Sequence, residues 1–455
     1  MDRPWWTDAV FYHIYPLGYC DAPVTGRADA GDPESRGEHR LRRVIDDLAR
    51  IRSLGCNALY LGPLFESGSH GYDTHDYFTV DSRLGDDDDL ADLVASAHEL
   101  DMRIVLDGVY NHVGRGFGAF RRLREEGPGS PHRNWFRDVS FDRDNRFGDG
   151  FVYRGWEGVD ELVALNHDEP EVREHLLRAA EHAVDRYGVD GIRLDVAYSL
   201  PFDFLDALSS RLRAKRDDVW LMGEVIHGDY AAFLAPGRLQ SVTNYECYKG
   251  LWSSCNDRNL HEIAHSLGRL FGPDGLLADA VAADRLPYNF ADNHDVGRVA
   301  SVLTTPRHLY PLYALLWTMP GIPSVYYGSE YALTGRKEDG DPALRPPADT
   351  VRAAAADDHP LAGFLRRLSR VRGASEALRV GSYRALVVES TLLAFERAAA
   401  AETVVVAVNL DADPAAVALP RGGSFECLES GEHVTVEPDG PLRVPGYGAR
   451  IVRRL

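Results

Sequence analysis

The sequence has few of the features that mark several broad protein classes. It holds only five cysteines, an odd number whose spacings fit neither a disulfide framework nor a zinc site. We therefore expect the reduced, unpaired thiols of a cytosolic protein. No stretch approaches the roughly 20 consecutive apolar residues of a membrane-spanning helix. Residues 1–16 lack the basic and then apolar regions of a signal peptide, so we expect a cytoplasmic location.

Positively charged residues are also fewer than negatively charged ones. The 50 Lys and Arg residues stand against 70 Asp and Glu residues, which gives a formal net charge of -20 and a pI of about 5.3. Nucleic acids and anionic membranes bind through basic patches, so neither is an expected partner. The composition is 44% hydrophobic, which is typical of globular proteins, and 455 residues allow two or three domains or one barrel with additions.

Short apolar runs alternate with amphipathic stretches along most of the chain. Helical patterns, with apolar residues three and four apart, cover 40–55, 171–188 and 201–215. This alternation predicts a parallel sheet, and eight candidate strands favour a (β/α)8 TIM barrel of the α/β class. Periodicity alone leaves a doubly wound open sheet as an alternative. The candidate strands are 9–15, 56–62, 103–109, 191–197, 219–225, 241–247, 285–291 and 322–328.

Two segments depart from this alternation. Residues 113–166 have no sustained period, which predicts an inserted lid domain after the third strand. The aromatic residues of this insert, Trp156 among them, can stack on a ligand or form a small core of their own. In residues 379–455, short candidate strands follow one another without helices, which predicts a C-terminal antiparallel β-sandwich domain. They are 383–390, 391–398, 402–410, 433–438 and 449–455. The barrel is then expected to comprise 1–112 and 167–378.

Polar residues gather where the candidate strands end, and barrel enzymes build their active sites at such ends. Each of these residues taken alone could be a turn residue, a helix cap or part of a structural ion pair. Their occurrence at the same end of one architecture makes a shared site the better interpretation. They are Asp107, Asn111 and His112 after strand three, Arg193 and Asp195 in strand four, Glu224 in strand five, and Asn293, His294 and Asp295 after strand seven.

Carboxylates without cysteine ligands suggest glycoside chemistry or a site for a hard metal ion. A retaining glycosidase needs two carboxyl groups about 5 Å apart, one as nucleophile and one as acid/base. Arg193 and Asp195 share one face of a strand, and the arginine favours the ionised form that a nucleophile needs. Glu224 has more apolar neighbours, which suits an acid with a raised pKa. Asp295 would stabilise a cationic transition state, while His112 and His294 would bind sugar hydroxyls.

Four segments, "DGVYNH", "GIRLDVA", "GEV" and "NHD", in this order resemble the signature regions of the α-amylase family, glycoside hydrolase family 13. The stretches "GYDTHDYF" (71–78), "MPGIPSVYYGSE" (319–330) and "DPALR" (341–345) resemble further segments of that family. The resemblance extends over roughly residues 5–380, and a trailing β domain is also as in the family. It implies a glycoside hydrolase that works through a covalent glycosyl-aspartate intermediate.

The resemblance also implies a role for individual residues. Asp195 would be the nucleophile, Glu224 the acid/base and Asp295 the stabiliser of the transition state. Trp156 is an aromatic candidate for substrate binding from the insert. The other residues expected to bind substrate are Tyr72, His112, Arg193, His294, Asp341 and Arg345.

The expected activity is hydrolysis of α-1,4-glucosidic bonds in short maltooligosaccharides to maltose and small sugars. The stretch "YRGWEGVDELVALN" (153–166) resembles cyclomaltodextrinases and neopullulanases, and Ala197 after the nucleophile resembles α-1,4-acting members. Linear chains, cyclomaltodextrins and a mixed α-1,4/α-1,6 cyclic tetrasaccharide are all candidate substrates. A 4-α-glucanotransferase with the same intermediate is the alternative. A non-catalytic amylase-like binding protein is more remote, because all three carboxylates are present.

No cofactor is expected to be required, and an oligosaccharide substrate is the expected partner. Asn111 matches a position that binds calcium in many family members, so a structural calcium ion stays open. Residues 142–150 are rich in oxygen ligands, but Arg146 and Phe147 stand where an EF-hand loop needs an acid and a glycine. A polar loop is therefore expected there. The dimer-building N-terminal domain of related enzymes does not carry over, and a homo-oligomer stays open.

Overall fold

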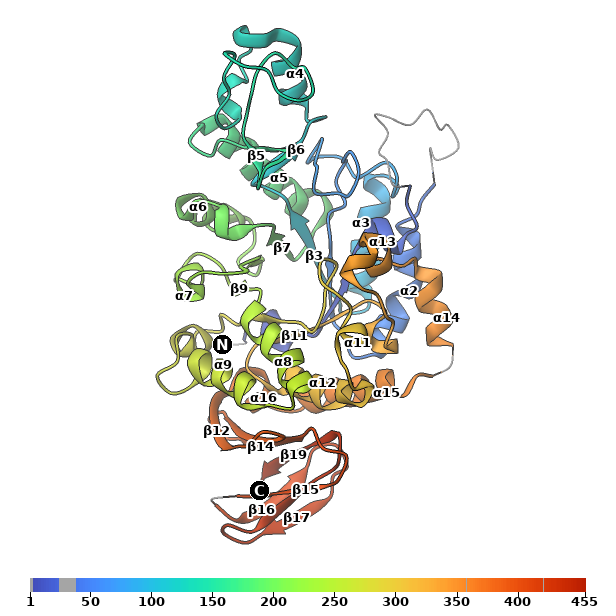
Figure 1. Ribbon diagram of the computed structural model, residues 1–455, viewed down its shortest axis with the longest axis vertical. Coiled ribbons are helices and arrows are strands. Elements are labelled where there is room, and N and C mark those ends of the chain that lie inside the picture. The colour runs from blue at the N-terminus through green and yellow to red at the C-terminus, as the bar shows by residue number, and fades with distance from the viewer. Residues whose placement is uncertain (1–2, 24–37, 357, 420) are drawn as a thin grey trace.

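Eight parallel strands form a closed barrel in the computed structural model of the chain (Figure 1). The structure describes residues 3–23, 38–356, 358–419 and 421–455, so small parts of the expected barrel and C-terminal ranges lie outside the described residues. The strand order is β10-β11-β1-β2-β3-β7-β8-β9, and a parallel bridge between Thr243 and Tyr288 joins the two ends. This closure confirms the (β/α)8 barrel and excludes the open sheet.

The barrel strands are short, and almost all of their residues are buried. All four residues are buried in β1, β2, β7 and β8, as expected of parallel strands covered on both faces. Each strand lies within one of the apolar runs predicted from the sequence. Their bounds are β1 Phe11–Ile14, β2 Ala58–Leu61, β3 Arg103–Gly108, β7 Gly191–Leu194, β8 Trp220–Gly223, β9 Ser241–Val242, β10 Tyr288–Asn289 and β11 Ile322–Tyr326.

Larger helices follow these strands, and three of them, α2, α5 and α6, match the amphipathic stretches predicted at 40–55, 171–188 and 201–215. The larger helices start with local signals such as the capping box of α3, in which the Asp86 carboxylate accepts from the N–H groups of Asp88 and Asp89. The barrel helices are α1 Pro16–Tyr19, α2 Arg42–Ser53, α3 Asp87–Glu99, α5 Pro170–Tyr187, α6 Phe202–Lys215, α7 Tyr230–Phe233, α8 Tyr245–Asp257, α9 His261–Phe271, α10 Ala278–Ala282, α11 Val299–Val302, α12 Leu309–Thr318, α13 Asp341–Leu344, α14 Ala348–Ala355, α15 Pro360–Gly373 and α16 Glu376–Val380.

The segment after β3 folds into a small unit at one end of the molecule (Figure 1). Its three-stranded sheet has the order β4-β6-β5, with β4 His112–Gly114, β5 Gly155–Trp156 and β6 Val159–Ala164. Helix α4, Gly118–Glu126, was not expected. It is only nine residues long, and the three residues that it buries, Ala119, Phe120 and Leu123, are too few to show a period in the sequence.

The C-terminal residues form antiparallel sheets at the opposite end (Figure 1). A six-stranded sheet has the order β12-β13-β14-β19-β16-β17, and β15 pairs with β18. Three strands were not predicted, namely β15 Ala415–Ala418, β16 Gly423–Cys427 and β18 Pro441–Val444, because each is short and only partly buried. The predicted ones are β12 Ser382–Val388, β13 Leu392–Ala398, β14 Thr403–Asn409, β17 His433–Val436 and β19 Gly448–Arg454.

One face of the six-stranded sheet belongs to the same hydrophobic core as the barrel. Phe395, Val404, Val406 and Ile451 are buried in the core that also contains helix α12. The other face packs on β15 and β18 in a second, smaller core. Within the described part of the chain, no helix has both the length and the apolar character needed to cross a bilayer.

Candidate active site

The carboxyl ends of the barrel strands carry the polar residues singled out in the sequence. Arg193 lies on β7, Asp195 directly follows that strand, and Glu224 directly follows β8. His112 begins β4 shortly after β3, and residues 293–295 lie beyond β10. Asp195 is 5% exposed and Glu224 6% exposed. Because parallel strands share one direction, these residues from separate parts of the sequence meet at one end of the barrel.

Arg193 is the centre of a buried network of charges. Its Nη1 donates to Oδ1 of Asp195 at 2.9 Å and to the two carboxylate oxygens of Asp107 at 2.9 and 3.0 Å. Its Nη2 lies 2.8 Å from Oε1 of Glu224. One guanidinium group therefore bridges Asp195 and Glu224 and holds their carboxyl groups close together. The arginine side chain is buried, so these interactions are weakly screened by water.

The turn after β7 directs a backbone donor at Glu224. Val196 adopts a left-handed conformation with a φ of 48°, which is unusual for a β-branched residue. Its N–H donates to Oε2 of Glu224 at 2.9 Å. The Tyr245 hydroxyl, at the start of α8, donates to Oε1 at 3.4 Å. Backbone strain at Val196 thus accompanies a hydrogen bond that orients the Glu224 carboxyl group.

A second group of contacts surrounds Asp295, whose side chain is 40% exposed. His294 Nε2 lies 2.9 Å from its Oδ2, and Arg345 Nη2 lies 3.3 Å from its Oδ1. The Tyr72 hydroxyl hydrogen-bonds to His294, and the two rings are parallel within 9°. Arg345 in turn pairs with the half-exposed Asp341 at 2.9 Å. The structure therefore brings these five residues together in one chain of contacts.

His112 and Trp156 lie on the Asp195 side of the site. His112 Nε2 is 3.9 Å from Oδ2 of Asp195 and has no hydrogen-bond partner among the described residues. The Asn111 amide donates to Nδ1 at 3.2 Å, so the neutral ring carries its proton on Nε2. Burial lowers the pKa of His112 to about 3, which keeps the ring neutral. The Trp156 and His112 rings face each other at 15°, with centroids 6.0 Å apart.

The electrostatic environment differs between the two aspartates. Burial first, and then the carboxylates of Glu224 and Asp107, raise the pKa of Asp195 well above its usual range, against the opposing effect of Arg193. The expected ion pair with Arg193 is present, but it does not by itself set the charge of Asp195. At Asp295, burial opposes ionisation, yet His294 and then Arg345 lower the pKa well below its usual range. Water also reaches Asp295, so we expect it to be fully ionised at neutral pH.

Several residues of the site were missed or left without a role by sequence reasoning. Asp107 was noted only as a strand-end residue, yet it accepts from Tyr60 at 2.7 Å and Tyr72 at 3.2 Å as well as from Arg193. The Tyr15 ring lies under Arg345, with the guanidinium carbon 4.2 Å from the ring centroid. The signal in the sequence was the presence of aromatic residues at strand ends, whereas the site was predicted from the charged and polar residues there.

The described residues do not fit the calcium site that Asn111 suggested. The Asn111 amide is turned to His112, and the Asp149 carboxylate in the 142–150 loop is neutralised by Arg115 at 2.8 Å and Arg124 at 2.9 Å. Within the ranges that the structure describes, the one compact group of three or more His, Cys, Asp or Glu side chains is His39, Asp86 and Asp89.

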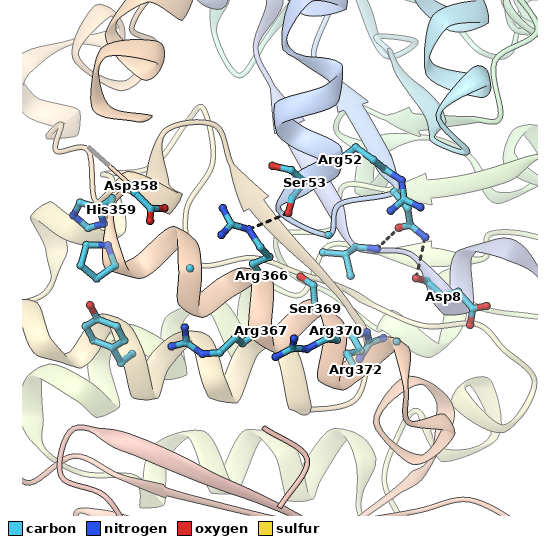
Figure 2. A pocket seen from close by; sticks show the side chains of 17 residues that line it. Asp8, Arg52, Ser53, Asp358, His359, Arg366, Arg367, Ser369, Arg370 and Arg372 are labelled. Atoms are coloured by element: carbon cyan, nitrogen blue, oxygen red, sulfur yellow. Dashed lines mark hydrogen bonds between the residues drawn. The ribbon is translucent and has the colours of Figure 1, made fainter. Parts of the chain in front are cut away.

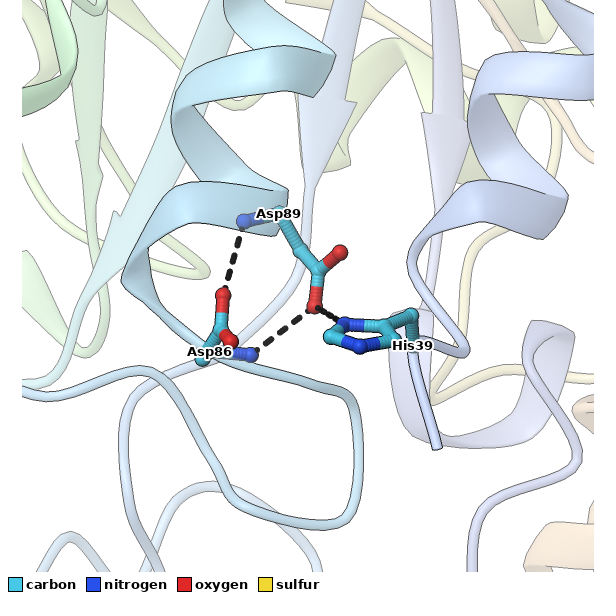
Figure 3. A group of neighbouring side chains, drawn as sticks. All are labelled: His39, Asp86 and Asp89. Carbon is cyan, nitrogen blue, oxygen red and sulfur yellow. Dashed lines mark hydrogen bonds and ion pairs between the residues drawn. The ribbon is translucent and has the colours of Figure 1, made fainter. Parts of the chain in front are cut away.

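Figure 3 shows how the carboxylates of that group are already engaged. Asp86 caps helix α3, while Asp89 accepts from the Asp86 N–H at 3.0 Å and contacts His39 Nδ1 at 2.6 Å. These contacts account for the cluster as a helix cap. It carries no metal assignment.

Comparison with known proteins agrees with this geometry. A family model described as the catalytic domain of α-amylase matches residues 14–370. A cyclomaltodextrinase from Bacillus sp. is 30% identical over 443 residues, which cover 94% of this chain and 76% of that protein. The ligand-free structure of a cyclic α-maltosyl-(1→6)-maltose hydrolase from Arthrobacter globiformis superposes with a TM-score of 0.79 and 27% identity, covering 97% of this chain and 99% of that one. A cyclomaltodextrinase structure gives a TM-score of 0.84 with 27% identity and covers 100% of this chain and 79% of its own.

Proposed function

Because this chain belongs to the α-amylase family of glycoside hydrolases, we propose that it is a retaining hydrolase of α-1,4-glucosidic bonds in short maltooligosaccharides. Cyclic substrates are favoured over long starch chains. The observation that carries the proposal is the bridge that Arg193 forms between Asp195 and Glu224 at the carboxyl end of the barrel. A retaining mechanism needs two carboxyl groups within about 5 Å of each other, and a shared guanidinium keeps them near that spacing.

In the first step, the Asp195 carboxylate attacks the anomeric carbon of the sugar while Glu224 donates a proton to the leaving oxygen. With a linear substrate this gives a covalent glycosyl-Asp195 intermediate and releases a shortened glucan, and with a cyclic substrate the opened chain itself stays bonded to Asp195. In the second step, Glu224 removes a proton from water, which attacks the anomeric carbon and releases Asp195. The glycosidic oxygen thus leaves protonated, and the configuration at the anomeric carbon is retained after two inversions.

The neighbouring residues serve the transition state of both steps. Asp295 is held ionised by His294 and Arg345, so it can stabilise the positive charge that develops on the sugar ring. The neutral His112 has an unpaired Nε2 proton available for a sugar hydroxyl. Tyr72 and Trp156 offer flat rings, and Asp341 with Arg345 offers polar contacts to the adjoining sugar.

Two observations support cyclic or short substrates. The Arthrobacter globiformis relative is named for the hydrolysis of cyclic α-maltosyl-(1→6)-maltose, and the two chains cover each other almost completely. The Bacillus relative is named a cyclomaltodextrinase. We extend to this chain the class of substrate in those names. We also propose a cytoplasmic location. Oligosaccharides of this kind would reach a cytoplasmic enzyme by import.

We also propose a division of the chain into a barrel of residues 1–112 and 167–378, a lid of residues 113–166 and a β-sandwich of residues 379–455. The lid assignment is supported by the ring contact between Trp156 and His112. Through that contact the insert forms part of the wall of the candidate site.

The first test is the variant Asp195→Asn, assayed on maltotetraose, a cyclomaltodextrin, the mixed-linkage cyclic tetrasaccharide, pullulan and soluble starch. Without an ionised nucleophile the covalent intermediate cannot form, so we expect activity to fall by roughly four orders of magnitude or more.

Rapid ring opening to maltose by the natural chain, with starch nearly untouched, would support the proposal. Products longer than the starting sugar would assign a glucanotransferase, and substantial activity in a folded Asp195→Asn variant would refute the nucleophile.

A further inference from the structure

A large groove lies at the end of the barrel opposite to the candidate active site. Asp8 and Val10 precede β1, and Gly55 and Asn57 precede β2, so these lining residues mark the amino ends of the strands. The other wall is helix α15, and the groove has a volume of about 990 Å³ (Figure 2). That is at the upper end of the range in which small-molecule sites are found. Nothing in the proposed reaction uses this end of the barrel.

The groove is lined by an excess of positive side chains on a strongly acidic protein. Five arginines face two aspartates, and one of these aspartates, Asp8, is already paired with Arg379, which is not among the lining residues. The whole chain has a formal net charge of -20, so this local excess runs against its overall charge. The five are Arg52, Arg366, Arg367, Arg370 and Arg372.

Two of the exposed arginines are held in place along the groove. Arg366 donates from Nε to the carbonyl of Ser53 on the opposite wall at 3.1 Å (Figure 2). Arg52 donates from Nε to the carbonyl of Leu100, which does not line the groove, at 3.0 Å. Among the described residues, neither side chain makes a further hydrogen bond. Within the described residues, the Arg370 side chain makes neither an ion pair nor a hydrogen bond. The Arg367 side chain also makes neither of these contacts there, and it lies over the Phe364 ring. Hydrogen bonds thus position Arg52 and Arg366, the charge of Arg367 is felt by Glu429, and Arg370 has no acidic partner among the described residues.

The fifth arginine supplies an independent observation. Arg372 is 1% exposed and donates only to three backbone carbonyls, those of Trp317, Leu378 and Gly321. Its Nε is buried without a hydrogen-bond partner among the described residues. Burial, followed by the repulsion of Arg379, lowers the pKa of Arg372 to about 9. Asp8 partly offsets this effect, but no carboxylate among the described residues pairs directly with Arg372, and a buried cation without a paired anion is unfavourable.

We propose that this groove is a binding site for a small phosphorylated molecule. Guanidinium groups match the geometry of phosphate oxygens with two parallel hydrogen bonds, and such charge-assisted bonds are about twice as strong as neutral ones. The volume accommodates a molecule larger than phosphate alone, with its charged groups along α15 and over Arg372. The site is independent of the proposed hydrolysis at the other end of the barrel.

The probe for the test is inorganic pyrophosphate, titrated into the full chain at low ionic strength by isothermal titration calorimetry. We expect saturable binding with one site per chain and a rise in the midpoint of thermal unfolding, because a ligand of the folded state stabilises it. The double variant Arg367→Gln/Arg370→Gln should bind pyrophosphate roughly tenfold more weakly or worse, since each charge-assisted hydrogen bond is worth about a decade of affinity. Its activity on maltooligosaccharides should be unchanged.

The matched control is Arg178→Gln/Arg213→Gln, which removes two exposed arginines from α5 and α6 and changes the net charge equally. This control should bind pyrophosphate as the natural chain does. Equal weakening in both double variants would mean general electrostatic attraction and would overturn the assignment. Absence of binding at millimolar pyrophosphate would overturn it as well. Citrate is the competing probe, and tighter binding of citrate would assign carboxylates in place of phosphate.

Discussion

At the scale of single residues, the negative charge on Asp195 is needed for the proposed nucleophilic attack but lowers the stability of the fold. A carboxyl group with a higher pKa in the folded state binds its proton more tightly there than in the unfolded chain. The protonated Asp195 therefore stabilises the fold fully at acid pH. This stabilisation is lost as pH rises from about 3.9, the ordinary pKa of an aspartate, through the higher pKa of Asp195 in the folded state. At neutral pH the ionised group therefore lowers the stability of the fold.

Removing this charge should stabilise the protein. We expect Asp195→Asn to raise the free energy of unfolding at pH 7, because the amide removes the charge whose burial raises the pKa of the natural carboxyl group. The advantage should shrink as pH falls and the natural carboxyl group becomes protonated. Urea unfolding at pH 7 and pH 5, followed by circular dichroism, measures both differences. A variant that is less stable than the natural chain at pH 7 would contradict this account.

Arg193 acts through the shape of its side chain as well as its charge. A lysine at this position keeps the charge but has one nitrogen, so it cannot bridge Asp195 and Glu224 while also holding Asp107. We expect Arg193→Lys to lower kcat/KM by roughly 100-fold or more, because the two carboxyl groups lose their fixed relation. Steady-state kinetics on maltotetraose measures this loss. Arg211→Lys, on the outer surface between α5 and α6, is the control and should leave kcat/KM unchanged.

At the scale of elements, the capping box of α3 shows how a sequence signal becomes local stability. The Asp86 carboxylate accepts from two N–H groups at the start of α3, and Asp89 accepts from the N–H of Asp86. We expect Asp86→Ala to lower the free energy of unfolding by about 1 kcal/mol, the usual effect of losing such a cap. Asp92→Ala, an exposed change within the same helix, should have a much smaller effect. Equal losses in chemical denaturation would argue against the cap.

At the scale of the whole molecule, buried histidines set the response to acid. Burial lowers the pKa of His112 to about 3 and that of His167 to about 4, against an ordinary value near 6.5. Between pH 6.5 and about 4 the unfolded chain therefore binds protons that the folded chain does not. Each group contributes stability that is full above its unfolded pKa and decreases as pH falls.

We therefore expect the free energy of unfolding to fall as pH is lowered from 7 to 5. His167 lies away from the reacting carboxylates and donates to the Tyr110 carbonyl at 2.9 Å, a bond that glutamine can replace in part. His167→Gln should show a weaker dependence on pH than the natural chain, because one group no longer titrates differently. Urea unfolding at pH 7, 6 and 5 compares the slopes. Identical slopes would show that His167 does not contribute.

Much of the architecture could be predicted from the sequence, because the signals involved are local. Alternation of buried strand runs with helical periods is carried by residues next to one another, and it placed all eight barrel strands. Asp195, Glu224 and Asp295 could be proposed as site residues for the same reason, since the first two lie within candidate strand runs and the third lies shortly after one. Where the local signal was short, prediction failed: α4 and β15, β16 and β18 bury too few residues to show a pattern.

The sequence by itself determined the barrel, the family and the candidate carboxylates, because short-range periodicity and motifs encode them. Only the tertiary structure decided which groups share Arg193, since Asp107 and Glu224 reach it from neighbouring strands whose register fixes the contacts. It likewise decided that Arg52 and Arg370, more than 300 residues apart in the chain, line one groove. Such contacts arise from barrel closure and helix packing, and nothing in the neighbourhood of either residue along the sequence specifies them.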